Sequence, residues 1–259
     1  MALADPRPTV MMFHGCGSDP LKFQTESGMD AHVGAFKTYA VWPRGTSRSL
    51  SASAQATCHS GSGVSCGWNA GDLGSCQVPT SPRPDDVAFT EAIMEWMRDN
   101  LCVDMDKVFL VGFSNGGQMA YHLNCERAYL FAGIATTGMA SGSRGTPGQG
   151  SCSPSRALPA LSLCGSSDFA CSEPTSQTEA WAAATGCTGK SVRHEELSST
   201  TYCLHATGCP AGLPVQGCAI EGLAHCWPDV PGAGNTNCQN QNPANMDGSL
   251  HLLEFFQNL

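Results

Sequence analysis

The chain has little charge and no long apolar run. Only 14% of its 259 residues are charged, and 13 basic against 22 acidic residues give a formal net charge of -9. Because nucleic-acid binding needs clustered basic side chains that neutralise phosphates, we expect no nucleic-acid partner. No stretch of 18 or more apolar residues is present, so we expect no membrane partner either. The sequence also lacks any N-x-Ser/Thr site for N-glycosylation.

The N-terminal sequence MALADPRPTV lacks the apolar core of a secretion signal. The fifteen cysteines nevertheless predict an exported protein, because this number far exceeds cytosolic use and the cysteines are scattered, with no C-x-x-C pair of the kind that zinc modules need. We therefore expect a secreted or extracellular protein, stabilised by disulfides, whose signal has been removed. An odd number of cysteines leaves at least one thiol reduced.

Local context divides the cysteines into two groups. Cys16, Cys102 and Cys164 lie in apolar or motif segments and are candidates for reduced, buried thiols. The better disulfide candidates lie in loops and include Cys58, Cys66, Cys203, Cys209 and Cys238. The sequence does not determine how they pair.

The length and the 41% hydrophobic content indicate one domain, residues 1–259, with a single large core. Short apolar runs alternate with helical patterns, which is typical of a mainly parallel β-sheet covered by helices on both faces. The predicted strands are 9–15, 38–43, 107–113, 131–137, 157–165, 191–197, 200–206 and 215–222. The predicted helices are 84–101, 116–126, 172–186 and 246–259. The predicted loops are 46–67, 140–156 and 231–245, which are rich in Gly, Ser, Pro and Asn.

The segment VFLVGFSNGGQMA, residues 108–120, places a single serine between two glycines at the end of an apolar strand. Ser114 thus lies in a Gly-x-Ser-x-Gly motif with a strand before it and a helix after it, which is the setting of a nucleophile elbow. Such a turn exposes the serine Oγ at a helix N-terminus, which favours developing negative charge. The alternative is an ordinary turn serine. The strand–turn–helix context favours Ser114 as a nucleophile.

A serine nucleophile needs a histidine base and an orienting carboxylate. In this setting the order along the chain is serine, acid, histidine. Asp168 follows the predicted strand 157–165 and is the only aspartate between Ser114 and the last loops. Asp168 is therefore the predicted acid.

Four histidines follow Asp168. His194 and His205 lie in strand-like segments and His251 lies on the closing helix, so we expect packing or surface positions for them. His225 lies in a loop directly after the predicted strand 215–222, where it can reach the serine. His225 is therefore the predicted base.

An ester or amide hydrolase of this kind also needs two N–H donors for the developing oxyanion. One is expected from the backbone of Asn115, which follows the nucleophile, and the other from Cys16 in the loop FHGCGSD after the first strand. The Cys16 side chain is not needed for this role. A Cys16 nucleophile is the weaker alternative, because the ordered Ser, Asp and His explain more of the chain.

Seven features in order carry a family resemblance: FHGCGSD, CGWNAG, PDDVAF, VGFSNGGQMAYHL, the strand-end Asp168, GLAHCWPD and the closing LLEFF. Together they resemble the secreted esterases of the α/β-hydrolase superfamily that include poly(3-hydroxybutyrate) depolymerases, feruloyl esterases and acetyl xylan esterases. The resemblance covers residues 9–256 and implies an α/β-hydrolase fold. It implies Ser114, Asp168 and His225 as catalytic triad, with oxyanion donors at Cys16 and Asn115.

Three departures from the family pattern affect the sheet edge and the substrate-side loops. Few residues precede the His-Gly loop, so we expect a shortened N-terminal edge of the sheet. Cys164-Gly165 replaces the usual His-Gly before the acid, and residues 72–76 lack the adjacent cysteines often found there.

Two tryptophans are candidate substrate-binding residues. Trp227 follows the predicted base by two residues, and Trp68 lies in CGWNAG. An indole at either position can stack on a ring or a polymer chain, while the alternative for both is ordinary core packing.

The leading hypothesis is a serine carboxylesterase that forms an acyl-enzyme, with no cofactor or metal, on a neutral ester substrate that can be polymeric. We expect a monomer. Polyester, feruloyl ester and acetylated sugar are not ranked by the sequence. The alternatives are a disulfide-stabilised binding protein on a catalytically retired hydrolase fold, and a zinc protein using Cys203, His205 and Cys209, whose spacing fits a closed tetrahedral site poorly.

Overall fold

The computed structural model describes residues 5–47, 66–71, 76, 83–139, 152–171, 174–196, 201–228 and 246–259. The strands are β1 (Arg7–Phe13), β2 (Tyr39–Val41), β3 (Thr46–Ser47), β4 (Cys66–Gly67), β5 (Val103–Phe113), β6 (Gly133–Thr137), β7 (Ala160–Gly165), β8 (Ser191–Glu196), β9 (Tyr202–Ala206) and β10 (Val215–Ile220). The α-helices are α1 (Pro20–Ser27), α2 (Asp30–Val33), α3 (Asp86–Asn100), α4 (Asn115–Arg127), α5 (Pro174–Thr185) and α6 (Gly248–Gln257).

Eight strands form one sheet in the order β2-β1-β5-β6-β7-β10-β9-β8. The six strands from β2 to β10 pair in parallel, and β9 and β8 extend the sheet with antiparallel pairing. The short β3 and β4 form a separate antiparallel pair. The strand order places β5, which leads to Ser114, near the centre of the parallel part.

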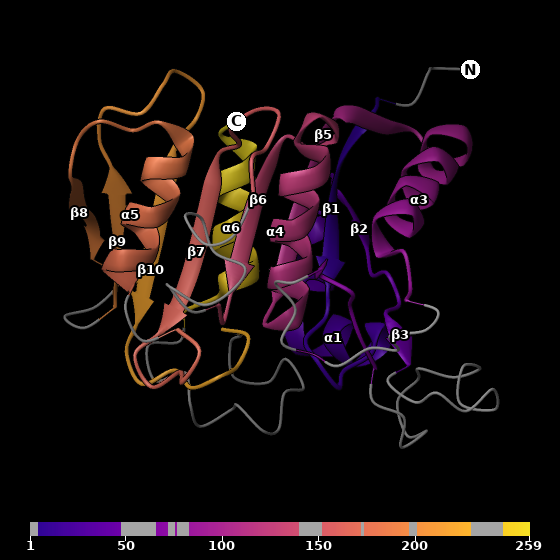
Figure 1. Cartoon of the computed structure of the whole chain (residues 1–259), viewed down its shortest axis with the longest axis horizontal. Helices are drawn as coiled ribbons and strands as arrows, with labels where there is room; N and C mark the ends of the chain where they lie inside the picture. The colour runs from indigo at the N-terminus through magenta and orange to yellow at the C-terminus, as the bar shows by residue number, and fades with distance from the viewer. Residues whose placement is uncertain are drawn as a thin grey trace.

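Alternate residues of the central strands enter two different cores. Val10 and Met12 of β1 face one core, which also contains Phe23 of α1 and Leu252 of α6. Met11 and its neighbours on the opposite face join the core under α3, α4 and α5. Figure 1 shows α4 and α5 in front of the sheet and α6 behind it. The strands are therefore buried on both faces, as their continuous apolar runs predict.

The predicted strands and helices are all present, with ends shifted by a few residues. The predicted mainly parallel sheet with helices on both faces is confirmed. Two helices, α1 and α2, were not predicted from the sequence, and β3 and β4 lie at the two ends of the predicted loop 46–67. The predicted loops 140–156 and 231–245 lie largely or wholly outside the described residues.

The ends of α1 follow ordinary sequence signals. Asp19 caps the helix by accepting hydrogen bonds from the backbone N–H groups of Leu21 and Lys22, and Pro20 occupies the first helical position. Gly28 ends the helix with φ 62°, a left-handed conformation that glycine adopts without steric cost. Helix α1 has few apolar residues, so its sequence lacks the hydrophobic periodicity from which a helix is predicted.

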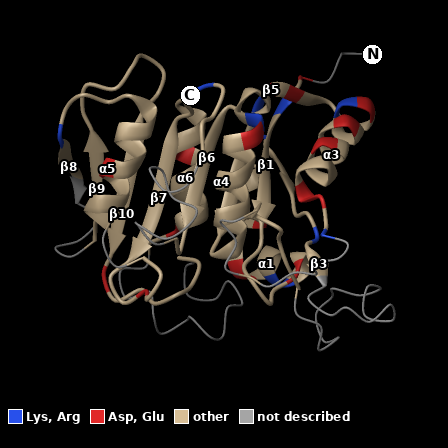
Figure 2. Cartoon of the chain, in the orientation of Figure 1, with Lys and Arg blue, Asp and Glu red and all other residues tan. Residues whose placement is uncertain are grey.

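Charged residues are sparse on the central strands and more frequent on α3 and near the ends of elements (Figure 2). This distribution follows from burial, since a charge placed between sheet and helices would lose its hydration. None of the described helices is both long enough and apolar enough to cross a membrane.

Helix α4 lies unusually close to β1 and β5 because two glycines lack side chains. A Cβ added to Gly116 would lie 2.0 Å from the carbonyl oxygen of Phe13, and one added to Gly112 would lie 2.2 Å from the carbonyl oxygen of Gly116. Both clashes involve backbone, which cannot rotate away. The two glycines of the serine motif are therefore required by the contact between helix and sheet.

We expect Gly116→Ala to lower the free energy of unfolding by more than ~3 kcal/mol, the range of severe packing defects. Gly34→Ala is the matched control: a Cβ there meets nothing within 4 Å, and Gly34 already has helical φ and ψ angles. The control should be neutral or slightly stabilising. Thermal unfolding of both variants checks this, and equal melting temperatures would contradict the proposed close approach.

Candidate active site

Loops at the carboxyl ends of the parallel strands bring the predicted site residues together. Cys16 follows β1, Ser114 follows β5, Asp168 follows β7 and His225 follows β10. Carboxyl ends of parallel strands meet at one edge of the sheet, which is the usual ligand-binding edge of an α/β fold.

Ser114 forms the turn between β5 and α4. Its backbone has φ 54° and ψ -120°, an unfavourable conformation for a residue with a side chain. Its N–H donates to the carbonyl oxygen of Thr137 over 2.9 Å, and its carbonyl accepts from the N–H of Gln118. Its side chain makes no capping hydrogen bond to α4. The strained backbone therefore leaves the Oγ available for another partner.

That partner is His225. The distance from His225 Nε2 to Ser114 Oγ is 2.9 Å, and the distance from His225 Nδ1 to Asp168 Oδ1 is 2.8 Å. Asp168 is 2% exposed, so its carboxylate is shielded from water. With Nδ1 protonated and donating to Asp168, Nε2 has a lone pair directed to the serine hydroxyl. The three side chains have the geometry of a serine–histidine–acid triad.

The turn that carries Asp168 is closed by a disulfide between Cys164, in β7, and Cys171. Asp168 Oδ1 also accepts a hydrogen bond from the N–H of Ala170 over 2.7 Å. Cys164 therefore crosslinks the turn that carries Asp168. The expectation that Cys164 is a reduced thiol is wrong, because the short turn places Cys171 beside it.

Cys16 is also disulfide-bonded, to Cys76, which corrects the expectation of a reduced thiol there and leaves no thiol for a Cys16 nucleophile. The loop after β1 is further held by a hydrogen bond of 2.6 Å from the N–H of Gly17 to the carbonyl of Cys66. Among the described residues, neither the N–H of Cys16 nor that of Asn115 has a hydrogen-bond partner. Both amides remain available as donors.

The Asn115 side chain links the turn at Ser114 to the segment Trp68-Asn69. Its Oδ1 accepts from the N–H of Trp68 over 2.8 Å, and the Trp68 indole N–H donates to the carbonyl of His14 over 2.9 Å. Trp68 therefore bridges the two loops that present the predicted oxyanion donors. Asn69 continues the connection, since its N–H donates to Asp86 at the start of α3.

His14 is a buried structural histidine. Its Nδ1 donates to the carbonyl of Gly15 over 2.9 Å, and its Nε2 accepts from the N–H of Gly45 over 3.1 Å. These partners require the neutral ring. Burial lowers the pKa of His14 to about 4, so the ring stays neutral in mildly acidic solution.

The cleft next to Ser114 has a volume of about 230 Å³. Its walls include the loop Gly15 to Ser18, Phe113, Ser114, His225, and Lys22 and Glu26 of α1. Phe113 and Phe169 both contact the His225 ring, with centroid distances of 5.0 and 4.5 Å, and Phe169 is 85% exposed. Lys22, Glu26, Phe113 and Phe169 were not predicted from the sequence as residues of the site. Two of them could have been considered from their position, because Phe113 lies inside the serine motif and Phe169 directly follows Asp168.

No family model matches the chain. Feruloyl esterase C of Emericella nidulans is 39% identical over 85 residues, which cover 32% of this chain and 27% of that protein. Feruloyl esterase B of Piromyces equi is 26% identical over 179 residues, which cover 62% of this chain and 31% of that protein. The chain thus spans less than a third of the length of these curated relatives.

Among solved structures, an acetyl xylan esterase from Aspergillus awamori superposes with a TM-score of 0.58 at 15% identity, over 86% of this chain and 85% of that one. The chain has the α/β-hydrolase fold. The crystal structure titled pOPH native gives a TM-score of 0.51 at 17% identity, over 80% and 74% of the two chains. Within the part of the chain that the structure describes, β2 is the edge strand of the sheet next to β1. The expected shortening of this edge stays a prediction.

Both tryptophans lie in the core of the protein. Trp68 is fully buried and Trp227 is 2% exposed. Trp227 borders the cleft, but its indole N–H donates to Ser249 Oγ and its ring packs edge-on against Phe23. The full burial of Trp68 contradicts its expected stacking on a substrate. Trp227 packs in the core and also lines the cleft, so its contact with a substrate stays a prediction.

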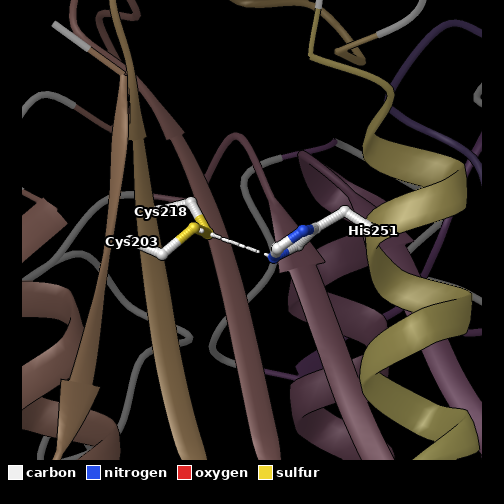
Figure 3. A group of neighbouring side chains, drawn as sticks. All are labelled: Cys203, Cys218 and His251. Carbon is white, nitrogen blue, oxygen red and sulfur yellow. Dashed lines mark hydrogen bonds between the residues drawn. A yellow bond between two sulfur atoms is a disulfide. The ribbon is translucent and has the colours of Figure 1, made fainter. Parts of the chain in front are cut away.

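The zinc hypothesis is wrong because both of its cysteines are in disulfide bonds. Cys203 pairs with Cys218, and Cys209 pairs with Cys187. Figure 3 shows the Cys203–Cys218 disulfide with His251 Nε2 beside it, 3.4 Å from Cys218 Sγ. A disulfide offers no thiolate to a metal.

The remaining cysteines agree with the sequence analysis where the structure describes them. Cys125 pairs with Cys152, and Cys66 and Cys226 are also disulfide-bonded. Cys102 is reduced, as predicted. Cys58 and Cys238 lie outside the described residues.

The other histidines after the acid lie elsewhere. His194 and His205 stack on each other with ring centroids 4.2 Å apart. Together with His251 they line a larger cavity of about 440 Å³ over β9, β10 and the end of α6. The triad residues do not line this cavity.

Protonation of two buried residues, Asp86 and His14, changes the stability of the fold in opposite directions. Burial raises the pKa of Asp86 to about 6, so the folded protein binds a proton that the unfolded chain releases near pH 3.8. His14 does the reverse, since the unfolded chain binds a proton near pH 6.5 and the folded protein only near pH 4. Falling pH between about 6 and 4 thus stabilises through Asp86 and destabilises through His14.

We expect Asp86→Asn to uncover the contribution of His14. Asparagine can still accept from the N–H of Asn69, and the variant should lose about 3 kcal/mol more stability than wild type as the pH falls from 6.5 to 4. Urea unfolding at several pH values measures this difference. Asp99→Asn, at a side chain that is 66% exposed, should follow wild type. Parallel curves for Asp86→Asn and wild type would refute the assignment.

Proposed function

We propose that the protein is a serine carboxylic-ester hydrolase that works through an acyl-enzyme. The observation that carries the proposal is the continuous hydrogen-bonded connection from Ser114 Oγ through His225 to the buried Asp168. Support also comes from the proteins named feruloyl and acetyl xylan esterase that the chain resembles. No cofactor is needed for this chemistry.

In the first half of the reaction His225 Nε2 accepts the Ser114 proton while Oγ attacks the ester carbonyl carbon. The carbonyl oxygen becomes negative and accepts hydrogen bonds from the N–H groups of Cys16 and Asn115. The intermediate collapses when His225 protonates the leaving alcohol. Asp168 holds the ring in the required tautomer and stabilises the imidazolium.

In the second half a water molecule attacks the acyl-serine and gives its proton to His225. The carboxylic acid is released when the second intermediate collapses and His225 returns the proton to Ser114. The same two amides serve both intermediates, so the protein needs only one oxyanion site.

The proposed substrate is an ester such as poly(3-hydroxybutyrate) or a feruloyl or acetyl ester of plant polysaccharide. The cleft of about 230 Å³ is smaller than the pockets that enclose a drug-sized ligand. It can therefore hold one small part of a substrate while the rest lies outside, as a polymer requires. The disulfides support action outside the cell.

The alternative is a binding protein on a retired hydrolase fold. A retired site would tolerate loss of any triad member or a misplaced donor. Here the three side chains are within hydrogen-bond distance and two backbone amides are available, which favours an enzyme.

We expect Ser114→Ala to lower turnover of p-nitrophenyl butyrate by at least ~1000-fold, because the nucleophile is lost while binding groups remain. Circular dichroism and the melting temperature should stay close to those of wild type. A fluorophosphonate probe should label wild type and not the variant.

A folded Ser114→Ala protein with full activity would contradict the proposal, because it would exclude Ser114 as nucleophile. A wild type that neither hydrolyses esters nor reacts with the probe would instead favour the retired binding protein.

A further inference from the structure

The cleft beside Ser114 contains a charged pair that the proposed mechanism does not use. Lys22 and Glu26 lie one turn apart on α1 and both line the cleft together with Ser114 and His225. The distance from Lys22 Nζ to Glu26 Oε1 is 3.5 Å. The pair therefore faces the space in which part of an ester substrate must lie.

Glu26 is mostly withdrawn from water. Its side chain is 18% exposed, and burial raises its pKa, although Lys22 acts in the opposite direction. Among the described residues, Lys22 is the only side chain that pairs with this carboxylate. A carboxylate has about four acceptor positions and an ammonium three donors, so one contact leaves most of this capacity unused.

Helix α1 holds the pair in a fixed position. Asp19 caps its first turn and Gly28 ends it. Phe23, on the buried side of the helix, packs edge-on against Trp227 and stacks on Phe113 with ring centroids 6.5 Å apart. Side chains carried by a helix anchored in this way are preorganised for a ligand.

The pattern of charge indicates the ligand chemistry. An anionic group would be attracted by Lys22 and repelled by Glu26, and a cationic group would meet the reverse. A hydroxyl group both donates and accepts, so it satisfies the two side chains at once. Phe113 adds an apolar wall to the same cleft, which suits the carbon skeleton that carries the hydroxyl.

We propose that Lys22 and Glu26 form a subsite that recognises a hydroxyl group of the ester substrate. Glu26 accepts a hydrogen bond from the hydroxyl, and Lys22 donates one to its oxygen. The inference rests on the proposed esterase function and names the substrate feature that this site selects. The hydroxyl can belong to the acyl part, as in a phenolic acid, or to the alcohol part, as in a sugar.

Two pairs of esters distinguish these sources. Methyl 4-hydroxycinnamate and methyl cinnamate differ by one hydroxyl on the acyl part. Glycerol monoacetate and propyl acetate differ by hydroxyls on the alcohol part. For one of the two pairs we expect wild type to prefer the hydroxylated ester by at least ~10-fold in kcat/KM, since a site built for a hydroxyl discriminates against its absence.

Substitutions of the pair test its role in this preference. Glu26→Met removes the acceptor at similar size and should reduce the preference to within ~2-fold, and Glu26→Gln, which keeps a neutral acceptor, should restore part of it. Lys22→Met provides a second test at a more exposed side chain. The control Glu91→Gln breaks the Arg127–Glu91 pair of α3 and α4, away from the cleft, and should keep the full preference.

The outcomes separate the inference from the proposed function. A folded Glu26→Met protein with an unchanged preference, or a wild type with no preference in either pair, would overturn the hydroxyl subsite while the esterase proposal stands. Failure of wild type to hydrolyse p-nitrophenyl butyrate and all four esters would overturn the esterase proposal and the subsite with it.

Discussion

The contact between helix α4 and strands β1 and β5 is the constraint on which the site depends. With no side chains at Gly112 and Gly116, the helix begins directly against the backbone of Phe13 and His14. The turn at Ser114, between these two glycines, has a strained conformation with φ 54°. The same contact brings the end of β1, and hence the N–H of Cys16, next to the nucleophile. One close approach therefore places both Ser114 and the loop that carries Cys16, the proposed oxyanion donor.

Crosslinks then fix each of the loops around the serine. A disulfide holds Cys16 in the loop after β1, another closes the turn of Asp168, and Cys226, next to His225, is disulfide-bonded as well. Loops of this kind would otherwise be the most mobile parts of the fold. Catalysis requires the reacting groups to be held in position before the substrate binds. The disulfides supply this rigidity where the core does not reach.

The site residues could be predicted best from the sequence where a motif occurs in a single structural context. The strand–turn–helix around Ser114, and the positions of Asp168 and His225 after strands, could be predicted because chain order and strand ends determine them. Cys164 and Cys16 were assigned wrongly because a thiol in an apolar segment looks the same whether or not a partner folds onto it. For Trp68 and Trp227 the sequence left substrate stacking and core packing both open, because proximity to a motif in sequence does not show which way a ring points.

The charges near the cleft are compatible with the proposed stabilisation of an oxyanion by an acidic chain. Asp168 is hydrogen-bonded to His225, and Glu26 forms an ion pair with Lys22. Asp19 accepts hydrogen bonds from the first backbone N–H groups of α1. Each of these carboxylates thus has a local partner that reduces its field in the cleft. His14, which borders the oxyanion loop, stays neutral because burial keeps its pKa low. In the proposed reaction the developing negative charge would meet backbone amides, while the neighbouring carboxylates have local partners. The proposed Lys22–Glu26 subsite could then contribute to selectivity without opposing the chemistry.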